Sequence, residues 1–139
     1  MRKFLYFCFL GFYAMSWSQD FKEHQWKNRI IIICTDSFSN PEFQKQKSEL
    51  NKYPNELKDR KLIVYKVTPD NYRFGLGSTI SLRTDKQFFD TFNNEKSQFK
   101  IILIGLDGSI KMTWENFIAP TDIFALIDQM PMRKNEIKN

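Results

Sequence analysis

The chain has 139 residues, a formal net charge of +5 and two cysteines. This length is typical of a single domain. The basic residues are spread over the chain and no cluster of them falls on one element, so the composition does not indicate a nucleic-acid-binding protein. Beyond the first 18 residues no segment is apolar enough to cross a membrane.

The N-terminus has the three parts of a secretory signal. Arg2-Lys3 is a short positive region, Phe4 to Met15 is an apolar run of about 12 residues, and Ser16-Trp17-Ser18 supplies the small residues that signal peptidase requires. The apolar run is shorter than the roughly 20 residues that a membrane helix needs. We therefore predict that residues 1–18 are a cleaved signal peptide and that the protein is exported to the periplasm or the exterior. Cleavage after Gln19 is the alternative.

Cleavage would leave a single thiol. Cys8 lies within the signal, so Cys34 is the only cysteine of the mature chain and no intramolecular disulfide can form. An exported protein with one thiol either buries it or uses it.

The first half of the chain predicts a strand, a helix and a second strand. Residues 19–28 form a polar lead-in, and four consecutive isoleucines between Arg29 and Cys34 predict a central strand that is covered on both faces. Asn40-Pro41-Glu42 is a helix start, and Tyr53-Pro54 is expected to kink or end that helix near residue 52. Lys61 to Val67 is predicted to be the next strand.

The second half begins with a long connection over residues 68–81. Thr84-Asp85-Lys86-Gln87 is a capping-box pattern that predicts a short helix, and Phe99 to Gly105 predicts another buried strand. Leu106-Asp107-Gly108-Ser109 predicts a type I′ hairpin turn that leads into a strand from Ile110 to Trp114. Pro120 opens a last helix, which Pro131 is expected to stop.

These elements follow the order strand-helix-strand-helix-strand-strand-helix. The order predicts an α/β fold, a single thioredoxin-like domain over residues 29–134 with a central four-stranded mixed sheet flanked by helices. The Arg29 and Phe99 strands are expected at its centre, and residues 135–139 are expected to be a tail.

Cys34 is the only candidate for a catalytic group. A reactive thiol needs a helix N-terminus, a nearby cation or a second cysteine to lower its pKa, whereas Cys34 ends an isoleucine strand. The loop where such folds keep a cysteine pair reads Phe38-Ser39-Asn40-Pro41, and Gln98 stands where oxidoreductases of this fold carry a proline. A buried structural thiol is the favoured interpretation, and a single-thiol redox enzyme is the alternative.

The sequence predicts neither a metal nor a cofactor. His24 is the only histidine and has no second ligand at helical or hairpin spacing, so we expect a solvated surface residue. Gly75-Leu76-Gly77 lacks the preceding strand and the third glycine of a dinucleotide fingerprint.

Two segments are candidates for binding. The long connection carries an aromatic and arginine mixture that is typical of recognition surfaces, although its aromatic residues could instead pack against the sheet. The end of the last helix offers methionine and arginine, which could equally fill core gaps and stop the helix. The candidate binding residues are Tyr72, Arg73, Phe74, Arg83, Met132 and Arg133.

Several segments together resemble the bacterial domain-of-unknown-function 4174 family. The C-terminal match consists of Leu103–Lys111 followed by Asp122–Arg133. Arg29–Ile33, Gln44–Leu50 and Leu57–Leu62 look like the N-terminal half of the family, so the similarity covers about residues 26–137.

The resemblance implies a thioredoxin- or peroxiredoxin-like fold, with related copies in vertebrate matrix-associated proteins that carry sushi repeats. It assigns no catalytic residues. After Lys111 members often continue with leucine and arginine, whereas this chain has Met112-Thr113-Trp114. We therefore expect an exported, non-enzymatic module that acts through contacts with an unidentified protein. The alternatives are a single-thiol enzyme that uses Cys34 for peroxide or disulfide chemistry, and a small-ligand site in the long connection.

Overall fold

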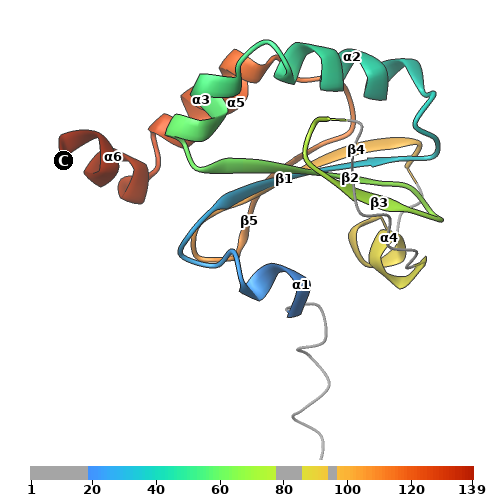
Figure 1. The fold of residues 1–139 in the computed structure, drawn as a ribbon, viewed down its shortest axis with the longest axis horizontal. Coiled ribbons are helices and arrows are strands. Elements are labelled where there is room, and N and C mark those ends of the chain that lie inside the picture. Colours follow the sequence, from blue (N-terminus) through green and yellow to red (C-terminus); the bar gives the residue numbers. More distant parts are fainter. Residues whose placement is uncertain (1–18, 78–85, 94–96) are drawn as a thin grey trace, which may run out of the picture.

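The computed structural model describes residues 19–77, 86–93 and 97–139 (Figure 1). The described part contains five strands, which are β1 (Arg29–Thr35), β2 (Leu62–Val67), β3 (Tyr72–Phe74), β4 (Phe99–Ile104) and β5 (Ile110–Trp114). Its helices are α1 (Gln19–Lys22), α2 (Pro41–Leu50), α3 (Pro54–Asp59), α4 (Lys86–Phe92), α5 (Pro120–Asp128) and α6 (Pro131–Lys138). None of these helices has the length and apolar character that crossing a membrane requires.

The strands form one mixed sheet in the order β3-β2-β1-β4-β5. β1 pairs in parallel with β2 and antiparallel with β4, so the isoleucine strand and the Phe99 strand lie centrally, as predicted. The predicted number of four strands is wrong, because residues 72–74 of the long connection add a fifth strand at the edge beside β2. A tight turn permits this pairing, since the Thr68 amide donates to the Asn71 carbonyl at 2.7 Å.

The two faces of the sheet carry separate apolar clusters. α2, α3 and α5 cover one face and α1 and α4 lie on the other (Figure 1). Side chains alternate along a strand, so Ile31 and Ile33 join the α2 face whereas Ile32 and Cys34 join the α4 face. All residues of β1 are buried, which explains the continuous apolar run from Ile30 to Cys34 within it.

Prolines separate two pairs of consecutive helices, α2 from α3 and α5 from α6. α2 ends at Leu50 and Pro54 opens α3, which confirms the predicted break. Pro131 ends the preceding helix as expected, but it also occupies the first turn of α6, where proline lacks only an amide that would have no helical partner. Residues 131–138 are therefore helical, and the expectation that the helix ends at residues 130–133 before an irregular tail is wrong.

The hairpin between β4 and β5 differs from the predicted type I′ turn. Gly108 has a φ of +82° as expected, but Asp107 does not share this left-handed conformation. The Gly108 amide donates to the Gly105 carbonyl at 3.0 Å, and the Gly105 amide donates to the Ser109 carbonyl at 2.9 Å. Leu106 and Asp107 are thus the central turn residues, and Gly108 follows them as the positive-φ residue of a longer hairpin loop.

Candidate functional site

The candidate site lies where β1 ends and α2 begins. The Asp36 amide donates to the Gln98 carbonyl at 3.0 Å and so joins the loop after β1 to the residue before β4. The Asp36 carboxylate accepts hydrogen bonds from the Asn40 side chain and the Ser37 amide, both at 2.9 Å. The bond from Asn40 is the main cause that lowers the pKa of Asp36. The loop is therefore held by its own polar groups.

The N-terminus of α2 is capped by an amide side chain. Asn40 accepts hydrogen bonds from the amides of Glu42 at 2.9 Å and Phe43 at 3.3 Å, and Pro41 occupies the first turn. A helix N-terminus is one of the positions that lower the pKa of a thiol. Here asparagine fills that position, so the helix offers no thiol to a substrate.

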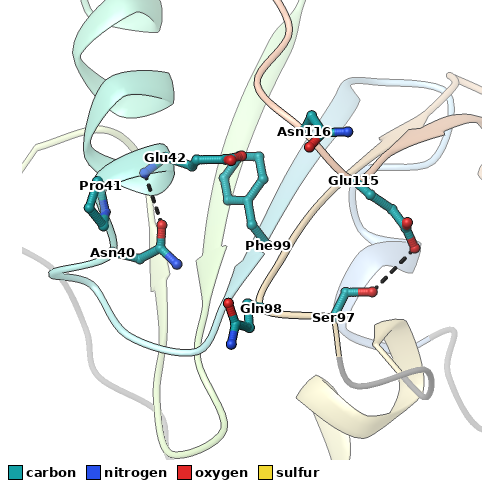
Figure 2. Close-up of a pocket in the computed structure, with 8 residues that line it drawn as sticks. All are labelled: Asn40, Pro41, Glu42, Ser97, Gln98, Phe99, Glu115 and Asn116. Carbon is teal, nitrogen blue, oxygen red and sulfur yellow. Dashed lines mark hydrogen bonds between the residues drawn. The ribbon is translucent and has the colours of Figure 1, made fainter.

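A cleft of about 610 Å³ opens beside this helix start. Asn40 and Glu42 lie on one side of it, Ser97 and Glu115 lie on the other, and Phe99 lies between them (Figure 2). Ser97 donates to the Glu115 carboxylate at 3.2 Å. The complete lining is Asn40, Pro41, Glu42, Ser97, Gln98, Phe99, Glu115 and Asn116. The lining contains two carboxylates and no cationic residue, so its chemistry favours cationic or hydrogen-bond-donating groups.

Cys34 lies on the opposite face of the sheet from this cleft. It is a free, fully buried cysteine in the apolar cluster of Ile32 and Ile102, whereas Phe99 of the cleft belongs to the cluster on the α2 face. Burial raises the pKa of the Cys34 thiol to about 12, and the nearby Lys100 opposes this shift only in part. The structure therefore confirms the predicted buried thiol.

The binding candidates of the long connection divide between the two faces. Tyr72, Arg73 and Phe74 form β3. Phe74 contacts Tyr65 edge to face at 5.2 Å between ring centroids, although 45% of its surface stays exposed. The Arg73 guanidinium lies 4.3 Å from the centre of the Phe38 ring. Arg83 lies outside the described residues.

The two candidates after Met130 are also separated. Met132 is 41% exposed on α6, whereas Arg133 is only 5% exposed. Arg133 donates to the Asp128 carboxylate at 3.0 Å, to the Asp59 carbonyl at 3.0 Å and to the Asp59 carboxylate. Arg133 is therefore committed to internal ion pairs and is not available to a partner.

Arg133 belongs to a partly buried ion-pair network that sequence reasoning missed. Arg60 donates to both oxygens of Asp128, at 3.1 and 2.7 Å, and its guanidinium lies 4.7 Å from the Phe124 ring centre. Arg29 donates to both oxygens of Glu136, at 3.2 and 3.3 Å. The sequence did contain a signal for this network, because arginines stand at the edges of its apolar segments. A charged side chain in such a place is buried only when it has a partner.

His24 also differs from the sequence expectation. It is half-buried, and its Nε2 lies 2.7 Å from the Tyr65 hydroxyl. Its ring lies parallel to that of Phe74 at 6.4 Å. The expectation of a solvated histidine is wrong, because the lead-in packs on the sheet: the Trp26 amide donates to the Leu106 carbonyl at 2.7 Å. Within the described ranges no group of three or more His, Cys, Asp or Glu residues could hold a metal ion.

One protein family matches most of the chain. The model of the family described as a domain of unknown function, DUF4174, matches residues 20–136. The chain belongs to the DUF4174 family. Among curated proteins, none matches this DUF4174 protein significantly.

Solved structures show the same fold. The reduced 2-Cys peroxiredoxin of Plasmodium vivax is similar with a TM-score of 0.60 and 11% identity over 82% of this chain and 83% of that one. A structure described as Trgpx in its apo form has a TM-score of 0.48 and 16% identity over 87% of each chain. The peroxiredoxin match shows that the DUF4174 protein has a thioredoxin-like fold, as predicted.

Proposed function

We propose that this DUF4174 protein is an exported thioredoxin-fold module that binds a partner protein and performs no thiol chemistry. The observation that carries the proposal is the position of Cys34. This thiol is fully buried on the face away from α2, and a pKa of about 12 leaves almost no thiolate at neutral pH. The thiolate is the form that attacks peroxides and disulfides, so the buried thiol has no means to react.

Two residues near the start of α2 support the same conclusion. Asn40, which caps α2 with two hydrogen bonds, lies in the loop where redox proteins of this fold keep a cysteine pair. Gln98, which precedes β4, stands where those proteins carry a proline. No second cysteine follows the proposed signal peptide, so a sulfenic acid on Cys34 would have no resolving thiol within the chain.

The cleft beside α2 is the proposed contact surface. Glu42 and Glu115 give it negative charge without a cation in the lining, while Gln98 and Asn116 add amide groups (Figure 2). Phe99, buried at the base, provides an apolar contact. A partner segment with lysine or arginine side chains fits this chemistry, because carboxylates bind cations through charge-assisted hydrogen bonds.

Export is the part of the proposal that rests on the tripartite start of residues 1–18 alone. The mature protein would begin at Gln19 or Asp20. The intact mass of the protein recovered from culture fractions of its natural host tests this directly. A mass that retains residues 1–18 would contradict export by cleavage.

The lack of thiol chemistry is tested by activity assays on purified protein. We expect the wild type and Cys34→Ser to be equally inactive in hydrogen peroxide consumption and in insulin reduction, with an active thioredoxin and an active peroxiredoxin as assay controls. Peroxide or disulfide turnover by the wild type that Cys34→Ser abolishes would overturn the proposal in favour of the single-thiol enzyme.

The contact surface is tested with a cationic probe. Titration of ¹⁵N-labelled protein with a blocked tetralysine peptide should shift the backbone amides of residues 97–99 and 115–116. Glu42→Gln combined with Glu115→Gln should reduce these shifts strongly, whereas Glu49→Gln, on α2 outside the lining, should leave them unchanged. Equal shifts in both variants would refute the cleft as the contact surface.

A further inference from the structure

A buried lysine lies on the α2 face of the sheet, outside the cleft. Lys66 of β2 is only 2% exposed. It alternates with Leu62 and Val64, which face α2, and therefore points to the same side. Its Nζ donates to the Gly77 carbonyl at 3.1 Å. An ammonium group has three donors, so two N–H groups have no partner among the described residues.

Two further cations lie around this lysine. Arg73 is the register partner of Lys66 on β3, so both side chains lie on the same face. Burial is the main cause that lowers the pKa of Lys66 to about 8, and the charges of Lys47 on α2 and of Arg73 add to this shift. Phe38, under the Arg73 guanidinium at 4.3 Å, keeps that planar group in place.

Lys47, Lys66 and Arg73 form a cluster of cations that has no acidic partner among the described residues. Within residues 19–77, 86–93 and 97–139 none of the three forms an ion pair, whereas each buried arginine has one to three carboxylate partners: Arg29 has one, Arg60 has two and Arg133 has three. Burying an uncompensated charge costs free energy. A cluster that keeps three cations together without a carboxylate therefore has the features of an incomplete site that an anion completes.

We propose that Lys47, Lys66 and Arg73 form a binding site for a doubly charged oxyanion, such as a phosphate or sulfate group. Three cations favour a dianion over a single carboxylate, because a dianion leaves one excess charge where a monoanion leaves two. The Arg73 guanidinium matches the geometry of a tetrahedral oxyanion, and the two remaining donors of Lys66 supply hydrogen bonds from beneath. The anion could be free or an ester group of a larger molecule.

This site shares no residue with the cleft and does not depend on Cys34. The two proposals therefore fail independently.

Calorimetric titration of the purified protein with inorganic phosphate and with sulfate at pH 7 tests the site, at an ionic strength matched with sodium chloride. We expect saturable binding of one anion and a rise in melting temperature that chloride does not produce. Arg73→Gln and Lys66→Met should each weaken binding at least tenfold. Lys45→Gln is the control, because it removes an equal charge from α2 at a side chain that contacts Phe117. This variant should bind the anion like the wild type.

Lys66→Met also serves as its own folding control. Because it removes an uncompensated buried charge, its ligand-free melting temperature should equal or exceed that of the wild type. The proposal would be overturned if Lys66→Met or Arg73→Gln bound the anion with unchanged affinity. It would also be overturned if phosphate and sulfate raised the melting temperature no more than chloride does. Phenyl phosphate distinguishes the source: affinity equal to that of phosphate supports an ester ligand, whereas phosphate binding alone supports a site for the free anion.

Discussion

Arg29 and Glu136, which are 107 positions apart in the sequence, form a two-point ion pair at 3.2 and 3.3 Å. The pair joins the first residue of β1 to α6, the last helix. Arg29 also donates to the Arg60 carbonyl at 2.9 Å, so the start of β1, the end of α3 and α6 are fixed together. The arginines of the segments that resemble the DUF4174 family thus have a structural role in this chain.

Asp128 is the acid on which this network depends most, because it accepts hydrogen bonds from both Arg60 and Arg133. We predict that Asp128→Asn lowers the free energy of unfolding by about 2–4 kcal/mol, since it leaves two largely buried guanidinium groups without a shared partner. Urea denaturation followed by circular dichroism measures this change.

Glu49→Gln is the matched control. It removes a carboxylate that pairs with Lys52 at 2.6 Å on the surface of α2. Exposed pairs contribute less than about 1 kcal/mol, so the control should unfold close to the wild type. Similar losses in both variants would show that the network is not a special source of stability.

Gly108 provides a test of the hairpin. Its φ of +82° is accessible to glycine but strained for a β-branched residue. Gly108→Val should therefore cost about 1–3 kcal/mol. Gly77→Ala is the control, because Gly77 lies outside the positive-φ region and nothing lies within 4 Å of an added Cβ. Thermal melts that coincide for Gly108→Val and the wild type would contradict the backbone assignment.

Much of the fold could be predicted because its signals are local. The isoleucine run predicted a central strand that is covered on both faces, and all residues of β1 are buried. β3 could not be predicted in this way, because a three-residue strand has no periodicity and exists only through pairing with β2. The continuation into α6 was missed because Pro131 can stop one helix and start another.

The surroundings of the candidate site residues were less predictable, because many of them come from other segments of the chain. Burial of Cys34 follows from its own strand, so it could be predicted from the sequence. The role of Arg133 was not, because its partners come from α3, α5 and α6 and only meet in the folded chain. Lys66 has no signal in its own strand, because the cations near it, Arg73 on β3 and Lys47 on α2, belong to other elements.

Lys66 gives the protein a distinctive pH dependence. Burial lowers its pKa from an ordinary value of 10.5 to about 8 in the folded state, and the charges of Lys47 on α2 and Arg73 on β3 add to this shift. Between these values the unfolded chain binds more protons than the folded one, so this contribution to stability rises with pH. We predict that the wild type gains about 2 kcal/mol relative to Lys66→Met between pH 7.5 and 10.

Comparison with Lys66→Met removes the opposing effect of Cys34, which both proteins share. The thiol pKa is raised, so its contribution falls as the pH rises above about 9. Urea denaturation at four pH values measures the difference. A constant gap between the two proteins over this range would show that Lys66 titrates normally.

The central claim is that the thioredoxin-like fold of this protein holds its thiol where it cannot react. The most direct test is the rate at which Cys34 is labelled by an excess of a thiol reagent at pH 7, in native protein and in protein unfolded in urea. With Cys34 fully buried and its pKa raised to about 12, we predict native labelling at least 100-fold slower than labelling of the unfolded chain. Equal rates, or a native thiolate that titrates below the value of about 8.5 for a free cysteine, would contradict the account.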